Sequence, residues 1–156
     1  MEDFTDSVVV TGACGGIGES IARKFADAGA SVGLCDIAEP ALDRLSSELS
    51  QAGTRVYHYA FDVTDADAVR SFCDDTFQAL GRIDHLINTV GVVDNAGDVV
   101  DLPLDVWDRT LAVNLTSAFL MAKYAVPHII ASGGGSIVNI ASVSGFANQA
   151  RAMAYS

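Results

Sequence analysis

The chain has 156 residues, half of them hydrophobic, and a formal net charge of -11 from 9 basic and 20 acidic side chains. This composition suits one domain with a hydrophobic core and excludes a disordered chain. The negative charge would repel a nucleic-acid backbone, so we expect no nucleic-acid partner. No apolar run reaches the roughly 18 residues of a membrane span, so we expect no membrane partner either.

The first predicted strand, Ser7 to Val10, is followed by a glycine-rich stretch and then by an amphipathic helix that runs from Glu19 to Gly29. The apolar stripe of this helix is Ile17, Ile21, Phe25 and Ala28, and the glycines before it are Gly12, Gly16 and Gly18. A strand that passes through glycines into a helix places main-chain amides and the positive end of the helix dipole at one point. The pattern predicts a phosphate-binding loop for a nucleotide cofactor, and a tight turn without a ligand is the alternative.

Strands and helices are predicted to alternate along the rest of the chain. The further strands are Ser31 to Cys35, Arg55 to Tyr59, Ile83 to Asn88 and Ser136 to Ile140. One helix carries the stripe Val69, Phe72, Cys73, Phe77 and Leu80, with Thr64 and Asp67 as its capped start. A longer helix is capped by Asp105, is kinked or ended by Pro127, and has the predicted core stripe Trp107, Leu111, Leu115, Ala118 and Ala122.

This alternation predicts an α/β fold, a Rossmann-like doubly wound parallel sheet with strand order 3-2-1-4-5. We expect residues 1–156 to form a single dinucleotide-binding domain. The polar residues that follow the strands then meet at the carboxyl edge of the sheet, where such folds bind ligands. These residues are Gly12, Asp36, Asp62, Asn88 and Ser142.

Asp36 ends the second predicted strand, where a carboxylate can accept hydrogen bonds from the hydroxyls of an adenosine ribose. The same charge would repel the 2′-phosphate of NADP, so Asp36 favours NAD as the cofactor. A solvent-exposed aspartate without a ligand is the alternative interpretation.

Seven motifs in this order resemble the short-chain dehydrogenase/reductase family. They are Thr11-Gly12, Gly16-Ile17-Gly18, Asp36, Asp62-Val63, Asn114, the segment Ile137 to Ser142, and Tyr155. The resemblance covers nearly the whole chain, from Ser7 to Ser156.

The resemblance implies a role for each matched residue. Tyr155 would exchange a proton with the substrate hydroxyl, Ser142 would hydrogen-bond the reacting oxygen, and Asn114 would hold a water of the proton relay. The cofactor would be held by Gly12, Gly16, Ile17, Gly18, Asp36, Asp62, Val63 and the segment Asn88 to Gly91. The implied reaction is hydride transfer between NAD and a secondary alcohol or ketone.

Two features depart from the family pattern. Asn88-Thr89-Val90-Gly91 stands where the family usually has Asn-Asn-Ala-Gly, and the family's catalytic lysine would fall beyond Ser156. We therefore expect a domain truncated after the fifth strand, inactive alone, whose full-length form is an active homo-oligomer. The alternatives are an NAD-binding fragment without turnover and a nucleotide-site methyltransferase.

Cys14, Cys35 and Cys73 are an odd number with no C-x-x-C spacing, which favours reduced thiols and a cytoplasmic location. No metal site is expected, because the three histidines show no ligand spacing. These histidines are His58, His85 and His128. The acidic residues Asp94, Asp98 and Asp101 are predicted to lie in a solvated loop.

Overall fold

The computed structural model describes residues 5–93, 97–147 and 152–155. Its five strands form one parallel sheet in the order β3-β2-β1-β4-β5, which confirms the predicted order. The strands are β1 (Ser7–Thr11), β2 (Ser31–Asp36), β3 (Val56–Ala60), β4 (His85–Asn88) and β5 (Ser136–Asn139).

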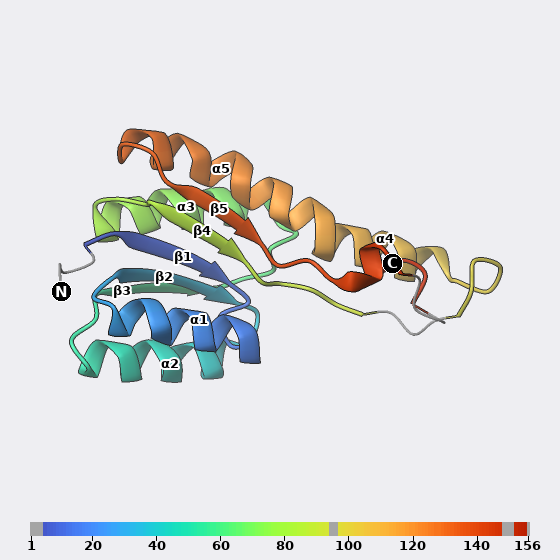
Figure 1. Cartoon of the computed structure of the whole chain (residues 1–156), viewed down its shortest axis with the longest axis horizontal. Coiled ribbons are helices and arrows are strands. Elements are labelled where there is room, and N and C mark those ends of the chain that lie inside the picture. Colours follow the sequence, from blue (N-terminus) through green and yellow to red (C-terminus); the bar gives the residue numbers. More distant parts are fainter. Residues whose placement is uncertain (1–4, 94–96, 148–151, 156) are drawn as a thin grey trace.

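Helices cover both faces of this sheet, as a doubly wound fold requires (Figure 1). They are α1 (Gly16–Asp27), α2 (Glu39–Gln51), α3 (Ala66–Leu80), α4 (Leu104–Leu111), the π-helical turn η1 (Ala112–Thr116), α5 (Ser117–Ala131) and the short 3-10 turn η2 (Val143–Gly145). Figure 1 shows α1 and α2 on one face, and α3 and α5 on the other.

Two buried clusters hold these layers together, and the alternation of side chains along β1 connects them. Val8 and Val10 pack with Leu42 in the cluster beneath α1 and α2. Val9 packs with Phe72 and Met121 in the cluster beneath α3 and α5. The central strand is therefore buried on both faces, as expected for a parallel sheet.

The predicted stripe of α3 is confirmed, but its predicted cap is wrong. Val69, Phe72 and the rest of that stripe face the core. The N-cap is Asp65, whose carboxylate accepts hydrogen bonds from the main-chain N–H groups of Asp67 and Ala68. Thr64 instead donates both its N–H and its hydroxyl to Asp62.

The long helix differs from its prediction in three ways. Asp105 lies inside the first turn of α4, whose N-cap is Pro103, and Pro127 does not end the helix, because α5 continues to Ala131. The predicted stripe is also wrong, because Trp107 and Leu115 are 40% and 65% exposed. The buried positions are instead Thr110, Val113, Ser117, Leu120, Met121, Ala125 and Ile129. The turn η1 lies between the two helices and interrupts their 3.6-residue period.

In α1, Ala22 and Gly18 face the core, with Ile21 and Phe25 packed beside them. Ile17 and Ala28 of the predicted stripe are exposed instead. Ile17 stands in the first turn of α1, at the carboxyl edge of the sheet.

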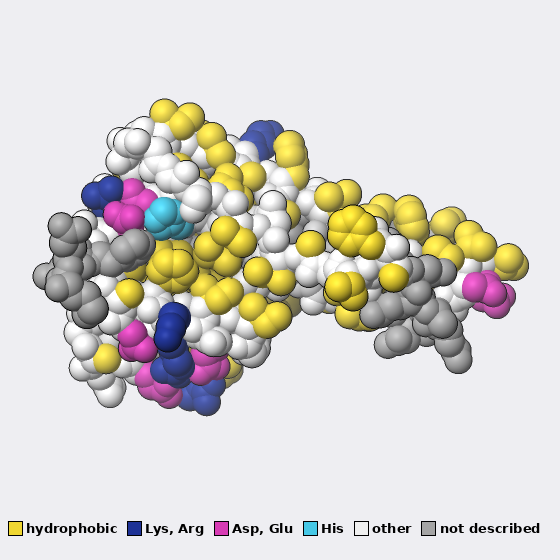
Figure 2. Space-filling view, viewed as in Figure 1, with side chains coloured by type: hydrophobic (Ala, Val, Ile, Leu, Met, Phe, Trp, Pro, Cys, Tyr) yellow, Lys and Arg dark blue, Asp and Glu magenta, His cyan; other side chains and the backbone are white. Residues whose placement is uncertain are grey.

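Beyond the sheet, the molecule carries many exposed hydrophobic side chains (Figure 2). They include Leu104, Leu115, Phe119, Val143 and Phe146. At the edge of the sheet β5 pairs with β4, and its four residues are exposed. Among the described residues, no helix is both long and apolar enough to cross a bilayer. Asp98 and Asp101 are exposed, whereas Asp94 lies outside the described residues.

Candidate active site

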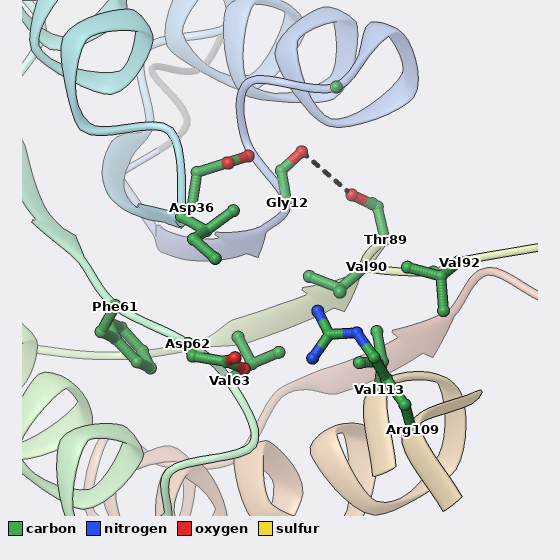
Figure 3. Close-up of a pocket in the computed structure, with 13 residues that line it drawn as sticks. Gly12, Asp36, Phe61, Asp62, Val63, Thr89, Val90, Val92, Arg109 and Val113 are labelled. Atoms are coloured by element: carbon green, nitrogen blue, oxygen red, sulfur yellow. Dashed lines mark hydrogen bonds between the residues drawn. The ribbon is translucent and has the colours of Figure 1, made fainter. Parts of the chain in front are cut away.

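A cavity of about 260 Å³ lies at the carboxyl edge of the sheet (Figure 3). It brings together five of the residues that the sequence singled out: Gly12, Asp36, Asp62, Val63 and Gly91. The other lining residues are Gly15, Ile37, Phe61, Thr89, Val90, Val92, Arg109 and Val113. The ends of four strands and the helix α4 thus meet around one hollow.

The glycine loop fits the start of α1 closely against the end of β1. Gly12 has a φ of +63°, a conformation that favours glycine. A Cβ on Gly18 would lie 2.1 Å from the carbonyl oxygen of Gly12, so Gly18 is required by packing. A Cβ on Gly16 would meet nothing within 4 Å, so packing places no such demand on Gly16.

The start of α1 has main-chain donors that the helix does not use. The first main-chain hydrogen bond of α1 runs from the N–H of Glu19 to the carbonyl of Gly15. The N–H groups of Gly16, Ile17 and Gly18 come before it and have no carbonyl partner within the helix. No side chain caps this end of the helix. Free amides and a positive dipole end suit an anion there.

Asp36 ends β2 on the rim of the cavity and ties the loops around it together. One carboxylate oxygen accepts the main-chain N–H of Cys14 at 2.9 Å, and the other accepts that of Ala38 at 3.0 Å. Each carboxylate oxygen can accept a further hydrogen bond. The side chain is therefore held in place without being saturated.

Cys14, in the glycine loop, is a poor nucleophile. Burial and the nearby charge of Asp36 raise the pKa of its thiol to about 11. Cys35 and Cys73 are buried, as expected for small hydrophobic side chains, and burial raises the pKa of each thiol, to about 12 for Cys73. The thiol form dominates at neutral pH in all three, so none is set up for covalent catalysis.

Asp62 and Val63 follow β3 and form another wall of the cavity. Thr64 donates its N–H and its hydroxyl to one carboxylate oxygen of Asp62, at 3.0 Å and 2.8 Å. The bond from the main chain of Thr64 lowers the pKa of Asp62, against the effect of burial, and the charge of Arg109 lowers it further. Asp62 is therefore an ionised acceptor, and its other oxygen accepts no hydrogen bond from the described residues.

The turn after β4 keeps its two ends despite the unusual residues between them. Asn88 is buried, and its amide donates to the side chain of Asn139 at 2.8 Å. Thr89 donates two hydrogen bonds to Thr11: its hydroxyl donates to the main-chain carbonyl, and its N–H donates to the side-chain hydroxyl. Thr89 thus joins the ends of β4 and β1 and lines the cavity beside Gly91.

Asn114 lies in η1 and fastens the loop after β4. Its side-chain oxygen accepts the N–H of Val92 and its amide donates to the carbonyl of Val92, both at 2.8 Å. This pair holds the side chain in place, and its oxygen and its amide each keep one further hydrogen-bonding position.

Ser142 and Tyr155 do not line the cavity. Ser142 caps η2: its oxygen accepts the N–H of Ser144 at 3.2 Å, and its hydroxyl donates to that of Ser144 at 3.1 Å. Tyr155 is half-buried in the turn at 153–155. Asn88, Asn114 and the residues from Gly16 to Gly18 also lie outside the cavity lining, although η1 and α1 border it.

Arg109 and Phe61 line the cavity without having been predicted there, whereas Thr89 belongs to the segment Asn88 to Gly91 that was expected at the cofactor. The signal for Arg109 was its position four residues before Val113 in a predicted helix, which places both side chains on one helix face. Among the described residues, no His, Cys, Asp and Glu side chains form a group that could hold a metal ion.

The profile of the short chain dehydrogenase family matches residues 6–156. The chain belongs to the short-chain dehydrogenase/reductase family. It is 37% identical over 156 residues to the cis-4-hydroxycyclohexanecarboxylate dehydrogenase of Sinomonas cyclohexanicum, covering 99% of this chain and 62% of that protein. It is 40% identical over 138 residues to the meso-2,3-butanediol dehydrogenase of Serratia marcescens, covering 88% of this chain and 53% of that protein.

Among solved structures, an NAD+-bound xylitol dehydrogenase superposes with a TM-score of 0.93 at 32% identity, covering 99% of this chain and 60% of that one. Both of the relatives named above are dehydrogenases by name. The chain spans between half and about three fifths of the length of these relatives.

Proposed function

We propose that the protein transfers hydride between NAD and a secondary alcohol or ketone, as part of a polypeptide that supplies the whole active site. The observation that carries the proposal is the carboxylate of Asp36 on the rim of the cavity, beside the glycine loop. An acceptor-only side chain at this point suits a ribose diol and repels a phosphate.

The residues around the cavity fit a dinucleotide. Unused amides at the start of α1 suit the pyrophosphate, and the open space at Gly16 lets a ligand approach them. Asp62 offers an ionised acceptor, and Val63 and Val113 offer apolar contact. The NAD+-bound xylitol dehydrogenase, which shares this fold, adds support.

NAD supplies the hydride chemistry, and the protein supplies binding, orientation and proton transfer. In this proposal Tyr155 exchanges a proton with the substrate oxygen, Ser142 hydrogen-bonds that oxygen, and Asn114 fixes the neighbouring loop and holds a relay water. The cofactor-binding residues are Gly12, Gly16, Ile17, Gly18, Asp36, Asp62, Val63, Asn88 and Gly91. These roles rest on the resemblance of the motifs.

The proposal includes residues 1–156 as a dinucleotide-binding domain, a cytoplasmic location and a homo-oligomeric full-length form. The cysteine pattern supports the location. Membership of the family argues against the methyltransferase alternative.

Substitution of Asp36 tests the choice of NAD. At about 4 Å and an effective dielectric constant of about 20, the repulsion of a 2′-phosphate is roughly 4 kcal/mol before solvent screening reduces it. In Asp36→Asn, which keeps one acceptor, we expect weaker binding of NADH and tighter binding of NADPH in calorimetric titrations. Asp27→Ala, an exposed acidic site at the other end of α1, is the control. Equal changes for both cofactors would contradict the proposal.

A further inference from the structure

Arg109 is a cation at the cavity that the motifs of the family do not account for. It stands on α4, and Figure 3 shows its guanidinium extending toward Val90 and Asp62. It forms no hydrogen bond or ion pair with the described residues, whereas Arg23, Arg70 and Arg82 each pair with a carboxylate. An unpaired guanidinium in a cavity has its planar face and its donors available for a ligand.

The neighbours of Arg109 define the kind of group that fits beside it. Val113, four residues further along, lines the same cavity and shares the helix face of Arg109. Ile37 and Val90 add apolar surface, and Asp62 presents an ionised carboxylate at one end. A flat ring with an exocyclic amine suits this arrangement, because its faces meet the apolar side chains and its N–H donors meet Asp62.

We propose that Arg109 is a positioning residue for the cofactor, whose guanidinium stacks on the adenine ring on the same side as Val113. The inference rests on the proposed NAD site and adds a residue that selects and holds one end of the cofactor. Guanidinium groups stack well on aromatic faces, and their planar shape makes the contact specific to arginine. The positive charge of Arg109 also lowers the pKa of Asp62 on the same wall, in addition to the larger effect of the hydrogen bond from the main chain of Thr64.

Calorimetric titrations of the purified protein with NAD, AMP and nicotinamide mononucleotide test this role. The two mononucleotides each carry one phosphate and differ in the base, so they separate contacts to adenine from contacts to phosphate. We expect Arg109→Ala to weaken the binding of NAD and of AMP by the same factor, about three- to tenfold, and to leave that of nicotinamide mononucleotide unchanged. Arg109→Met keeps an apolar stem and so controls for lost packing. We expect it to weaken the binding of NAD and AMP as Arg109→Ala does.

Two further variants separate the effect of the planar guanidinium from the effect of charge and from the loss of an arginine elsewhere. Arg109→Lys keeps the charge without the planar face, so we expect it to bind AMP nearly as weakly as Arg109→Ala. Arg70→Ala removes another exposed arginine, on α3 and away from the cavity, and is expected to bind every ligand as the wild type does.

Three results would overturn the inference. AMP affinity could be unchanged in Arg109→Ala, nicotinamide mononucleotide could lose as much affinity as AMP, or lysine could restore full binding. A wild-type protein that binds neither NAD nor AMP would instead refute the proposed function, and the role of Arg109 with it.

Discussion

Two glycines in the first turn of α1, Gly16 and Gly18, have different roles: Gly18 is required by packing, and Gly16 leaves room for a ligand. A Cβ on Gly18 would lie 2.1 Å from the carbonyl oxygen and 2.8 Å from the carbonyl carbon of Gly12. Both atoms belong to the backbone, so Gly18→Ala forces α1 away from β1. Strain of this kind costs about 3 kcal/mol, at the upper end of ordinary overpacking. For a domain of this size that cost corresponds to a fall in melting temperature of roughly 6 to 12 °C.

Gly16→Ala is expected to leave stability intact and to weaken NAD binding, because a Cβ there meets nothing within 4 Å. Alanine favours a helix over glycine by up to about 1 kcal/mol, so the melting temperature should be unchanged or slightly raised. The added methyl group stands where a phosphate would approach the free amides, and we expect NAD affinity to fall at least roughly tenfold.

Thermal melting and calorimetric titration of both variants measure the two effects independently. The reasoning is refuted if Gly18→Ala melts with the wild type, since the close approach to Gly12 would then be avoidable. It is equally refuted if Gly16→Ala binds NAD with wild-type affinity.

Two more predictions concern ionisable groups. Burial alone would raise the pKa of Asp84, but hydrogen bonds from Arg82 and from the N–H of Ser7 outweigh it and lower the pKa. The stabilisation from the ionised form is therefore complete above the unfolded pKa and is lost as the pH falls below about 4. Asp84→Asn should lower the free energy of unfolding by about 1–3 kcal/mol at pH 7 and by less at pH 3, as measured by urea denaturation. A gap that stays constant with pH would contradict this account. Because the pKa of Cys14 is raised to about 11, its alkylation at pH 8 should be on the order of a hundredfold slower than that of a free cysteine, as followed by mass spectrometry against the unfolded protein. Rapid labelling of Cys14 in the folded protein would disprove it.

The sheet could be predicted from the sequence because each strand is a short apolar run between polar or glycine-rich turns. Val8, Val9 and Val10 are buried on both faces, so their continuous hydrophobicity indicated a central parallel strand. The order of the strands followed from the handedness and shortness of the connections.

The face of the long helix could not be predicted, for a physical reason. Hydrophobic residues occur all around α5, so no single stripe stands out, and the π turn shifts the phase of everything after it. Leu115 fits a regular stripe in the sequence but points to solvent. Arg109 was missed for a related reason: its position in the cavity depends on how α4 is rotated toward the end of β4.

The cap of α3 was missed by one residue, because Thr64, Asp65 and Asp67 are all good capping candidates. The choice was decided by Asp62, which takes up both donors of Thr64 and leaves Asp65 to cap the helix. Residue type alone therefore identified the capping candidates, and the hydrogen bonds of Asp62 determined which of them caps the helix.

The π turn at Ala112–Thr116 has a consequence for how this protein can vary in length. A π turn is wider than an α turn and accommodates one extra residue, so deleting one residue there would restore a regular helix and leave the following segment close to its present orientation. Leu120 and Met121 would keep their places in the interior, whereas deletion of Asn114 itself would remove both hydrogen bonds to Val92. Deletion scanning should therefore show this interval to be more tolerant than the regular turns of α5, with Asn114 as the exception.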